Sequence, residues 1–178
     1  MVTRLPMLDL VARIGLGIVT LVWLLTSCSS SSSEVDGGPG GGEAQAAKRE
    51  MDALAEKLLP DLVPRLGEVT EMDAEFVERG GYGLYDYRAS AQVLRPAPRR
   101  EALAEVERVL EEHGLTVESP GETSDVTGTL GNVRVSVVWM SGDAVDTADL
   151  TVNTLRPASG DDDYVADTGP TDYTTYLR

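Results

Sequence analysis

The pattern of apolar and polar positions predicts one folded domain over residues 43–157, with two helices and several strands. From Glu43 to Leu59, apolar residues recur every three or four positions, which is the spacing of one helix face. Pro60 is expected to end or kink this helix, and residues 61–66 could add a turn before Gly67. A second helix is predicted from Pro98 to His113, because proline suits the first helical position and Gly114 suits the position after the last.

Period-two alternation predicts the strands, most clearly over residues 82–94. The apolar face of that strand consists of Tyr85, Tyr87, Ala89, Ala91 and Val93. Residues 68–79 fit a strand and a helix face, and we favour the strand because Gly80 and Gly81 indicate a turn after it. Further strand segments are expected at residues 115–118, 126–140 and 149–155.

These elements follow one another in the order α-β-β-α-β-β-β. The order predicts an α+β fold in which an antiparallel sheet of about four to five strands carries two helices on one face. The small side chains of Ala89 and Ala91 would let a helix pack closely on the sheet.

Polar segments lie on both sides of the predicted domain. Residues 28–42 are rich in serine and glycine, so we expect a flexible tether that cannot bury enough surface to fold. Residues 158–178 contain Asp161-Asp162-Asp163 and are interpreted as an acidic, disordered tail. The alternative is that the tail docks on the domain through its apolar side chains, which are Tyr164, Tyr173, Tyr176 and Leu177.

Residues 1–27 have the parts of a secretory signal. Arg4 and Arg13 supply positive charge, an apolar run continues to Leu25, and the small residues Thr26 and Ser27 follow. The run is bounded by Arg13 and is shorter than the roughly 20 apolar residues of a membrane-spanning helix. A cleaved signal therefore fits better than a permanent span.

The segment Leu25-Thr26-Ser27-Cys28 resembles the lipobox of bacterial lipoproteins. The resemblance implies cleavage between Ser27 and Cys28 and transfer of a diacylglyceryl group to the Cys28 sulfur. Two acyl chains hold a protein stably on a bilayer, so the implied location is the outer face of the cell membrane. Composition and the order of elements over residues 44–157 also resemble small actinobacterial lipoproteins of unassigned function, and this likeness assigns no functional residue.

Charge and cysteine content narrow the possible partners. The chain has 30 acidic and 15 basic side chains, a formal net charge of −15. The acidic charge disfavours nucleic acid as a partner and electrostatic adhesion to anionic lipid, since proteins bind both through clustered lysine and arginine. Cys28 is the one cysteine, so no intramolecular disulfide can form. We expect membrane contact through the lipid anchor, and an envelope protein or ligand of unknown identity as partner.

His113 is the one histidine and could serve as a general base. Its place just before Gly114 favours a cap at the helix C-terminus, where a positive imidazolium is stabilised. The acidic groups Asp161–Asp163 and Asp143, Asp146 and Asp149 lack the spacing of a calcium-binding loop. Tyr82 could line a groove, but core packing is favoured for its cluster with Tyr85 and Tyr87, and Trp139 is expected in the core for the same reason.

The sequence therefore predicts no catalytic residue, no metal ligand and no cofactor. We expect a lipid-anchored, non-enzymatic binding or interaction module with Cys28 as its lipidation site. One alternative is a carrier whose sheet and helices enclose an apolar cavity for a lipid or glycolipid. A less favoured alternative is a hydrolase that uses a pair of carboxylates.

Overall fold

The computed structural model describes residues 41–118, 125–140, 147–160 and 162–177. The signal, the lipobox with Cys28 and residues 28–40 of the expected tether lie outside this range. The elements in chain order are α1 (Gly41–Leu66), β1 (Asp73–Glu78), β2 (Leu84–Val93), α2 (Arg99–Glu112), β3 (Thr116–Glu118), β4 (Asp125–Leu130), β5 (Val133–Met140), β6 (Thr147–Thr154), β7 (Ala158–Ser159), α3 (Asp162–Thr168), β8 (Thr171–Asp172) and the 3-10 helix η1 (Tyr173–Leu177).

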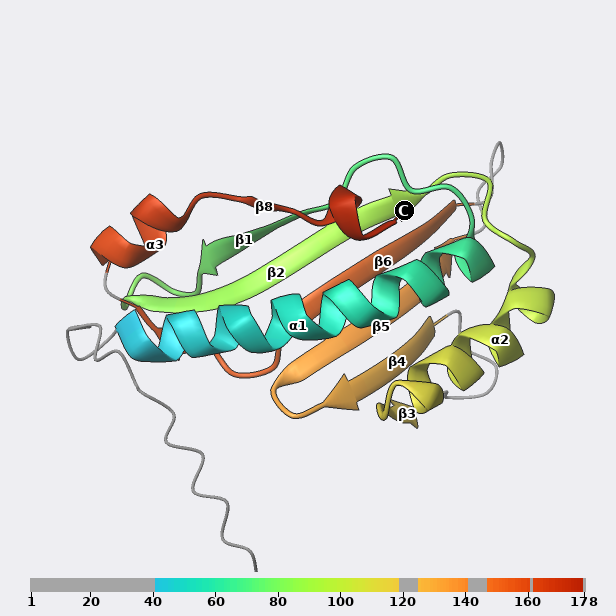
Figure 1. Cartoon of the computed structure of the whole chain (residues 1–178), viewed down its shortest axis with the longest axis horizontal. Helices are drawn as coiled ribbons and strands as arrows, with labels where there is room; N and C mark the ends of the chain where they lie inside the picture. The colour runs from blue at the N-terminus through green and yellow to red at the C-terminus, as the bar shows by residue number, and fades with distance from the viewer. Residues whose placement is uncertain (1–40, 119–124, 141–146, 161, 178) are drawn as a thin grey trace, which may run out of the picture. The chain divides into compact units, whose positions relative to one another are not determined.

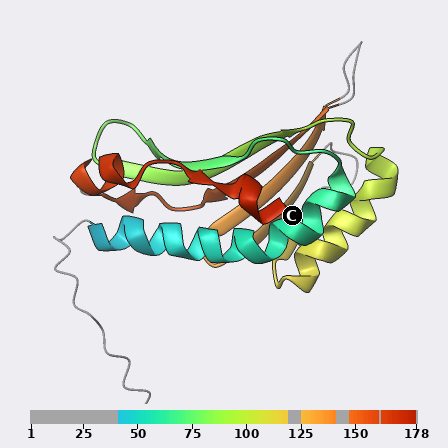
Figure 2. The same ribbon diagram turned by 45° about the horizontal axis from the view of Figure 1, so that its top comes forward.

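The strands form one open antiparallel sheet in the order β3-β4-β5-β6-β2-β1-β8, and β7 pairs with the start of β2 (Figure 1). Helices α1 and α2 lie side by side on one face of this sheet (Figure 2). The predicted α+β class and the placement of these two helices are therefore confirmed. The expected counts are wrong, because the described residues contain three α-helices and eight strands.

The core lies between the two helices and the sheet. Alternate residues of β2 are buried from Tyr85 to Val93, as the period-two pattern predicted. Residues 68–79 contain the strand β1, which pairs with β2 along its whole length. Ala89 and Ala91 belong to the same core cluster as Leu58 and Leu62 of α1, so the small side chains contribute to the surface on which α1 packs.

Helix α1 continues through Pro60 and Pro64 to Leu66, seven residues beyond the end we expected at Leu59. Each proline removes one backbone hydrogen bond, at a cost of roughly 3 kcal/mol in a helix interior. Leu58, Leu59, Leu62 and Leu66 are fully buried, and each contributes about 1.5–3 kcal/mol by leaving water. Tertiary burial thus outweighs the local penalty.

Residues 126–140, expected to form a single interrupted strand segment, are a hairpin of β4 and β5. The chain reverses at Gly131, whose φ of 57° lies in the left-handed region that favours glycine. The backbone N–H of Asn132 donates to Glu50 Oε1 at 2.9 Å, which ties the turn to α1. Gly128 does not interrupt the strand, because it lies within β4.

The C-terminal residues, expected to be disordered, form β7, α3, β8 and η1 and dock on the domain. We call residues 162–177 the C-terminal strap. Its β8 pairs with β1, and the N–H of Tyr173 donates to the carbonyl of Met72 at 2.8 Å. Tyr173 is fully buried, so the docking alternative is the one that the structure shows. Burial of aromatic side chains decides that these residues dock, and the acidic composition of the segment obscured this in the sequence.

Candidate functional site

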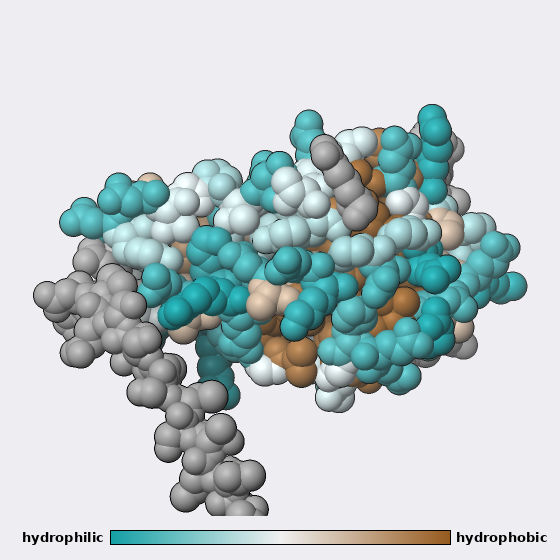
Figure 3. All heavy atoms as spheres, in the orientation of Figure 1, coloured by the Kyte–Doolittle hydropathy of each residue, from teal (hydrophilic) through white to brown (hydrophobic). Residues whose placement is uncertain are grey.

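The face of the sheet opposite α1 and α2 carries no helix among the described residues (Figure 2). The side chains on this open face come from the strand positions that alternate with the core. On β2 they include Asp86, Arg88, Ser90 and Gln92, the polar set that alternation placed away from the core. The helix side, which Figure 3 shows, is largely covered by hydrophilic side chains.

Strand register aligns two arginines on the open face. Arg88 of β2 lies opposite Asn153 of β6, and Asn153 lies opposite Arg134 of β5. Because neighbouring strands are about 4.8 Å apart, the two arginine Cα atoms are separated by roughly 10 Å. Two residues further along each strand, Thr151 of β6 lies opposite Ser90 of β2 and Ser136 of β5. Hydroxyl groups therefore lie beside the arginine row.

The two arginines line a shallow hollow of about 340 Å³, which we call the arginine hollow. Its lining is Arg79, Asp86, Arg88, Arg134, Ser136, Thr151 and Asn153. Two further hollows lie on the same face. One of about 230 Å³ is lined by residues that include Arg88, Gln92 and Asp149. The other, of about 460 Å³, is lined by residues that include Glu71, Asp73 and Glu75.

The arginines of the hollow differ in their partners. Arg79 Nε is 2.8 Å from Asp86 Oδ2, which neutralises one positive charge. Within the described residues, neither Arg88 nor Arg134 forms an ion pair or a side-chain hydrogen bond. Both are exposed, so two planar guanidinium groups are available for a carboxylate or a phosphate.

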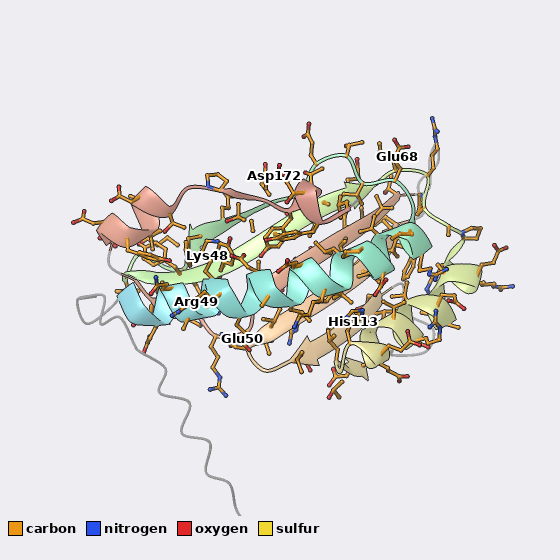
Figure 4. The ribbon with its side chains drawn as sticks, viewed as in Figure 1. Lys48, Arg49, Glu50, Glu68, His113 and Asp172 are labelled. Atoms are coloured by element: carbon orange, nitrogen blue, oxygen red, sulfur yellow. The ribbon has the colours of Figure 1, made fainter. Side chains whose placement is uncertain are left out.

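A second polar cluster joins α1, β2 and the C-terminal strap, and Figure 4 shows Lys48 on the side of α1 nearer the strap. Lys48 Nζ donates to Asp52 Oδ2 at 2.5 Å and to Thr171 Oγ1 at 2.8 Å. The Tyr87 hydroxyl donates to Thr171 Oγ1 at 2.9 Å, and the Tyr173 hydroxyl donates to Asp52 Oδ1 at 2.6 Å. We call these five residues the Lys48 cluster.

Electrostatics in the Lys48 cluster favour a structural role. Burial raises the pKa of Tyr87, and burial together with the Asp52 carboxylate raises the pKa of Tyr173. Burial lowers the pKa of Lys48, but its interactions with the Asp52 carboxylate and the Tyr87 side chain favour the charged form and outweigh burial, so the net pKa is raised. The tyrosines therefore stay neutral and the lysine stays charged at neutral pH. Neither is poised to exchange a proton, and the cluster fastens the strap to α1 and β2.

His113 occupies the C-cap position of α2, and its backbone N–H, not its imidazole, donates to the helix carbonyl of Val109. Its Nε2 lies 2.9 Å from Asp61 Oδ2 of α1, so the side chain links the two helices. Trp139 is buried and 7% exposed, as expected for a core residue. Tyr82 is 85% exposed and is absent from the linings of the three hollows.

Of the acidic groups weighed in the sequence, the structure describes Asp149, Asp162 and Asp163. Asp149 lines a hollow on the open face, and Asp162 accepts a hydrogen bond from the Tyr85 hydroxyl at 2.5 Å. Asp143, Asp146, Asp161 and the lipidation residue Cys28 lie outside the described residues. No three described histidine, cysteine, aspartate or glutamate side chains gather as a metal site.

Sequence reasoning missed Arg134 and the pairing of its row with Arg88. The alternation in β2 placed Arg88 on the polar face, but the register that aligns it with Arg134 depends on long-range pairing through β6. No described helix is long and apolar enough to cross a membrane. Comparison of the chain with protein-family models, curated proteins and solved structures gives no match.

Proposed function

We propose that the protein is a non-enzymatic binding module of the cell envelope, anchored through lipid on Cys28 at the outer face of the membrane. Its folded domain presents the open face of the sheet to a partner or ligand. The observation that carries this proposal is the arginine row, in which Arg88 and Arg134 are exposed and unpaired within the described chain.

Packing supports a binding surface over an apolar carrier cavity. Side chains of α1, α2 and the sheet form one cluster of buried residues between the helices and the sheet. The three hollows described above lie instead on the open face, and their linings are rich in polar and charged side chains. Such linings suit a polar ligand or partner better than a lipid chain.

The anchor is tested by replacing Cys28 with serine and fractionating cells, with Ser29→Ala as the matched control. Without the thiol no thioether to diacylglycerol can form, so Cys28→Ser is expected to leave the protein unprocessed or release it from the membrane. The control should stay in the detergent phase at mature size. If Cys28→Ser behaves as the control does, the anchor is wrong.

The binding surface is tested with a photo-reactive amino acid placed in the full chain in living cells. Thr151 on the open face and Glu111 on the exposed side of α2 give matched positions on opposite sides of the domain. We expect adducts from position 151 in excess of those from position 111. Equal yields from the two positions would contradict the assignment of the open face.

A further inference from the structure

We infer that the arginine hollow binds a small solute through one discrete anionic group, a carboxylate or a phosphate. This inference rests on the proposed function, because it gives the chemistry of the surface assigned there. The hollow holds two guanidinium groups without a carboxylate partner in the described chain, although the protein carries a net charge of −15.

The geometry favours an oxyanion. Arg88 and Arg134 flank Asn153 across three hydrogen-bonded strands. The side-chain amide of Asn153 donates to the carbonyl of Thr154 at 2.8 Å, which holds the asparagine in place between them. Side chains that converge from both sides can place their planar forks on one carboxylate or phosphate. The hydroxyls of Ser136 and Thr151 in the same lining are further donors.

The surroundings of the hollow restrict the size and charge density of the ligand. Glu75 of β1 lies opposite Arg88, and Asp73, Glu75 and Glu71 line the adjacent hollow. These carboxylates repel an extended polyanion or an anionic bilayer, whose negative charges would spread beyond the arginine row. A volume of about 340 Å³ also lies near the lower end of the range for small-molecule sites. The combination fits a small solute with one localised anionic group.

Pairing within the hollow withdraws one neighbouring carboxylate from Arg88. Asp86 lies two residues from Arg88 on the same face of β2 and could neutralise it. Its Oδ2 instead accepts from Arg79, and its Oδ1 is buried and has no partner in the described structure. Arg79 thus engages the carboxylate of Asp86, and Arg88 has no ion-pair partner among the described residues.

The test is calorimetric titration of the full-length protein in neutral detergent micelles at fixed ionic strength. The probes are inorganic phosphate, succinate and glucose, and vesicles of phosphatidylglycerol provide a separate arm. Arg88→Gln and Arg134→Gln remove one positive charge each from the hollow. Arg49→Gln is the matched control, because Arg49 is exposed on α1 on the helix side and the same charge is lost (Figure 4).

We expect phosphate or succinate to bind, glucose to give no heat, and each hollow variant to weaken the anion roughly tenfold, the effect of losing one charged hydrogen-bonding partner. Arg49→Gln should bind as the wild type does, and all variants should share its thermal unfolding midpoint. Binding of phosphate but not succinate would identify a phosphate group as the ligand chemistry, and binding of succinate but not phosphate would identify a carboxylate.

Three outcomes would overturn the inference: no anion binding, equal weakening by Arg49→Gln, or vesicle binding that depends on Arg88 and Arg134. Failure of the proposed function is recognised separately. If position 151 crosslinks in cells while anions neither bind nor compete, the open face is a binding surface of different chemistry. If anions bind but positions 151 and 111 crosslink equally, the hollow is a ligand site and the surface proposal fails.

Discussion

Gly128 in β4 shows how one missing side chain shapes the packing of α2. A Cβ atom added there would lie 2.9 Å from Leu115 Cδ2 and 3.3 Å from Leu110 Cδ1. Because both leucines are buried, Gly128→Ala is expected to lower the free energy of unfolding by about 1–3 kcal/mol through overpacking. Urea denaturation of the full chain measures this change.

Gly42 provides the control for this substitution. A Cβ atom there meets nothing within 4 Å, and the residue lies in the first turn of α1. Gly42→Ala should therefore be neutral or stabilise the domain by up to about 1 kcal/mol through helix propensity. Equal destabilisation by both substitutions would show that the contact with Leu110 and Leu115 is not the cause.

Two tyrosine hydroxyls hold the C-terminal strap with bonds of different strength. Tyr173 donates to the Asp52 carboxylate, whereas Tyr87 donates to the neutral Thr171 hydroxyl. A hydrogen bond to a charged group contributes about 1.5–3 kcal/mol and a neutral one about 0.5–1.5. Tyr173→Phe should therefore lower the free energy of unfolding more than Tyr87→Phe, as measured by urea denaturation. A larger loss for Tyr87→Phe would contradict this order.

Alkaline pH should loosen the packing of the strap against β2. The hydrogen bond from Tyr85 to Asp162, desolvation and the Asp162 charge raise the pKa of Tyr85 to about 12. The folded state therefore holds this proton more tightly than the unfolded chain, where tyrosine titrates near pH 10. The stabilisation is complete below about pH 10 and is lost as pH rises toward 12.

The measurement is urea denaturation at a series of alkaline pH values, with tyrosinate absorbance followed in parallel. Tyr85→Phe should reduce the fall in stability over this range. Tyr82→Phe is the matched control, since Tyr82 is 85% exposed, and it should leave the fall unchanged. A pH dependence that Tyr85→Phe does not alter would assign the effect to the other buried tyrosines.

The sequence pattern predicted those elements whose apolar residues recur with a single period, either the helical spacing or the two-residue alternation of a strand. Helix α2 ends within one residue of its expected bounds, and the buried face of β2 is the one that alternation indicated. The end of α1 was wrong because burial of Leu62 and Leu66 overrides Pro60. Docking of the strap was the less favoured alternative because its apolar residues are few, and their partners on α1 and β2 are remote in sequence.

The candidate site was only half visible in the sequence for a related reason. Alternation placed Arg88 on the polar face of β2, but it cannot show which residues of other strands lie beside it. That information is held in the β2-β6 and β5-β6 registers, which bring Arg134 into the row. The pairing of Arg79 with Asp86 across the β1–β2 turn likewise depends on the hairpin register, which alternation within one strand does not show.

At the scale of the whole molecule, stability and ligand binding should respond to salt in opposite directions. A net charge of −15 makes the compact state repel itself, and salt screens this repulsion. The ion pairs of the described residues are short-range and partly or largely exposed. Each therefore contributes only about 0–1 kcal/mol to stability, and this is all that salt screening can remove. Repulsion should therefore dominate the salt dependence of stability.

We expect the thermal unfolding midpoint to rise as sodium chloride increases from about 0.01 M to about 0.15 M, over which the Debye length falls from about 30 to about 8 Å. Over the same range the affinity of the arginine hollow for phosphate should fall, because chloride screens Arg88 and Arg134. Circular dichroism and calorimetry measure the two quantities on one sample. A midpoint that falls with salt would mean that local pairs such as Lys48–Asp52 stabilise the folded state by more than the repulsion of the net charge destabilises it.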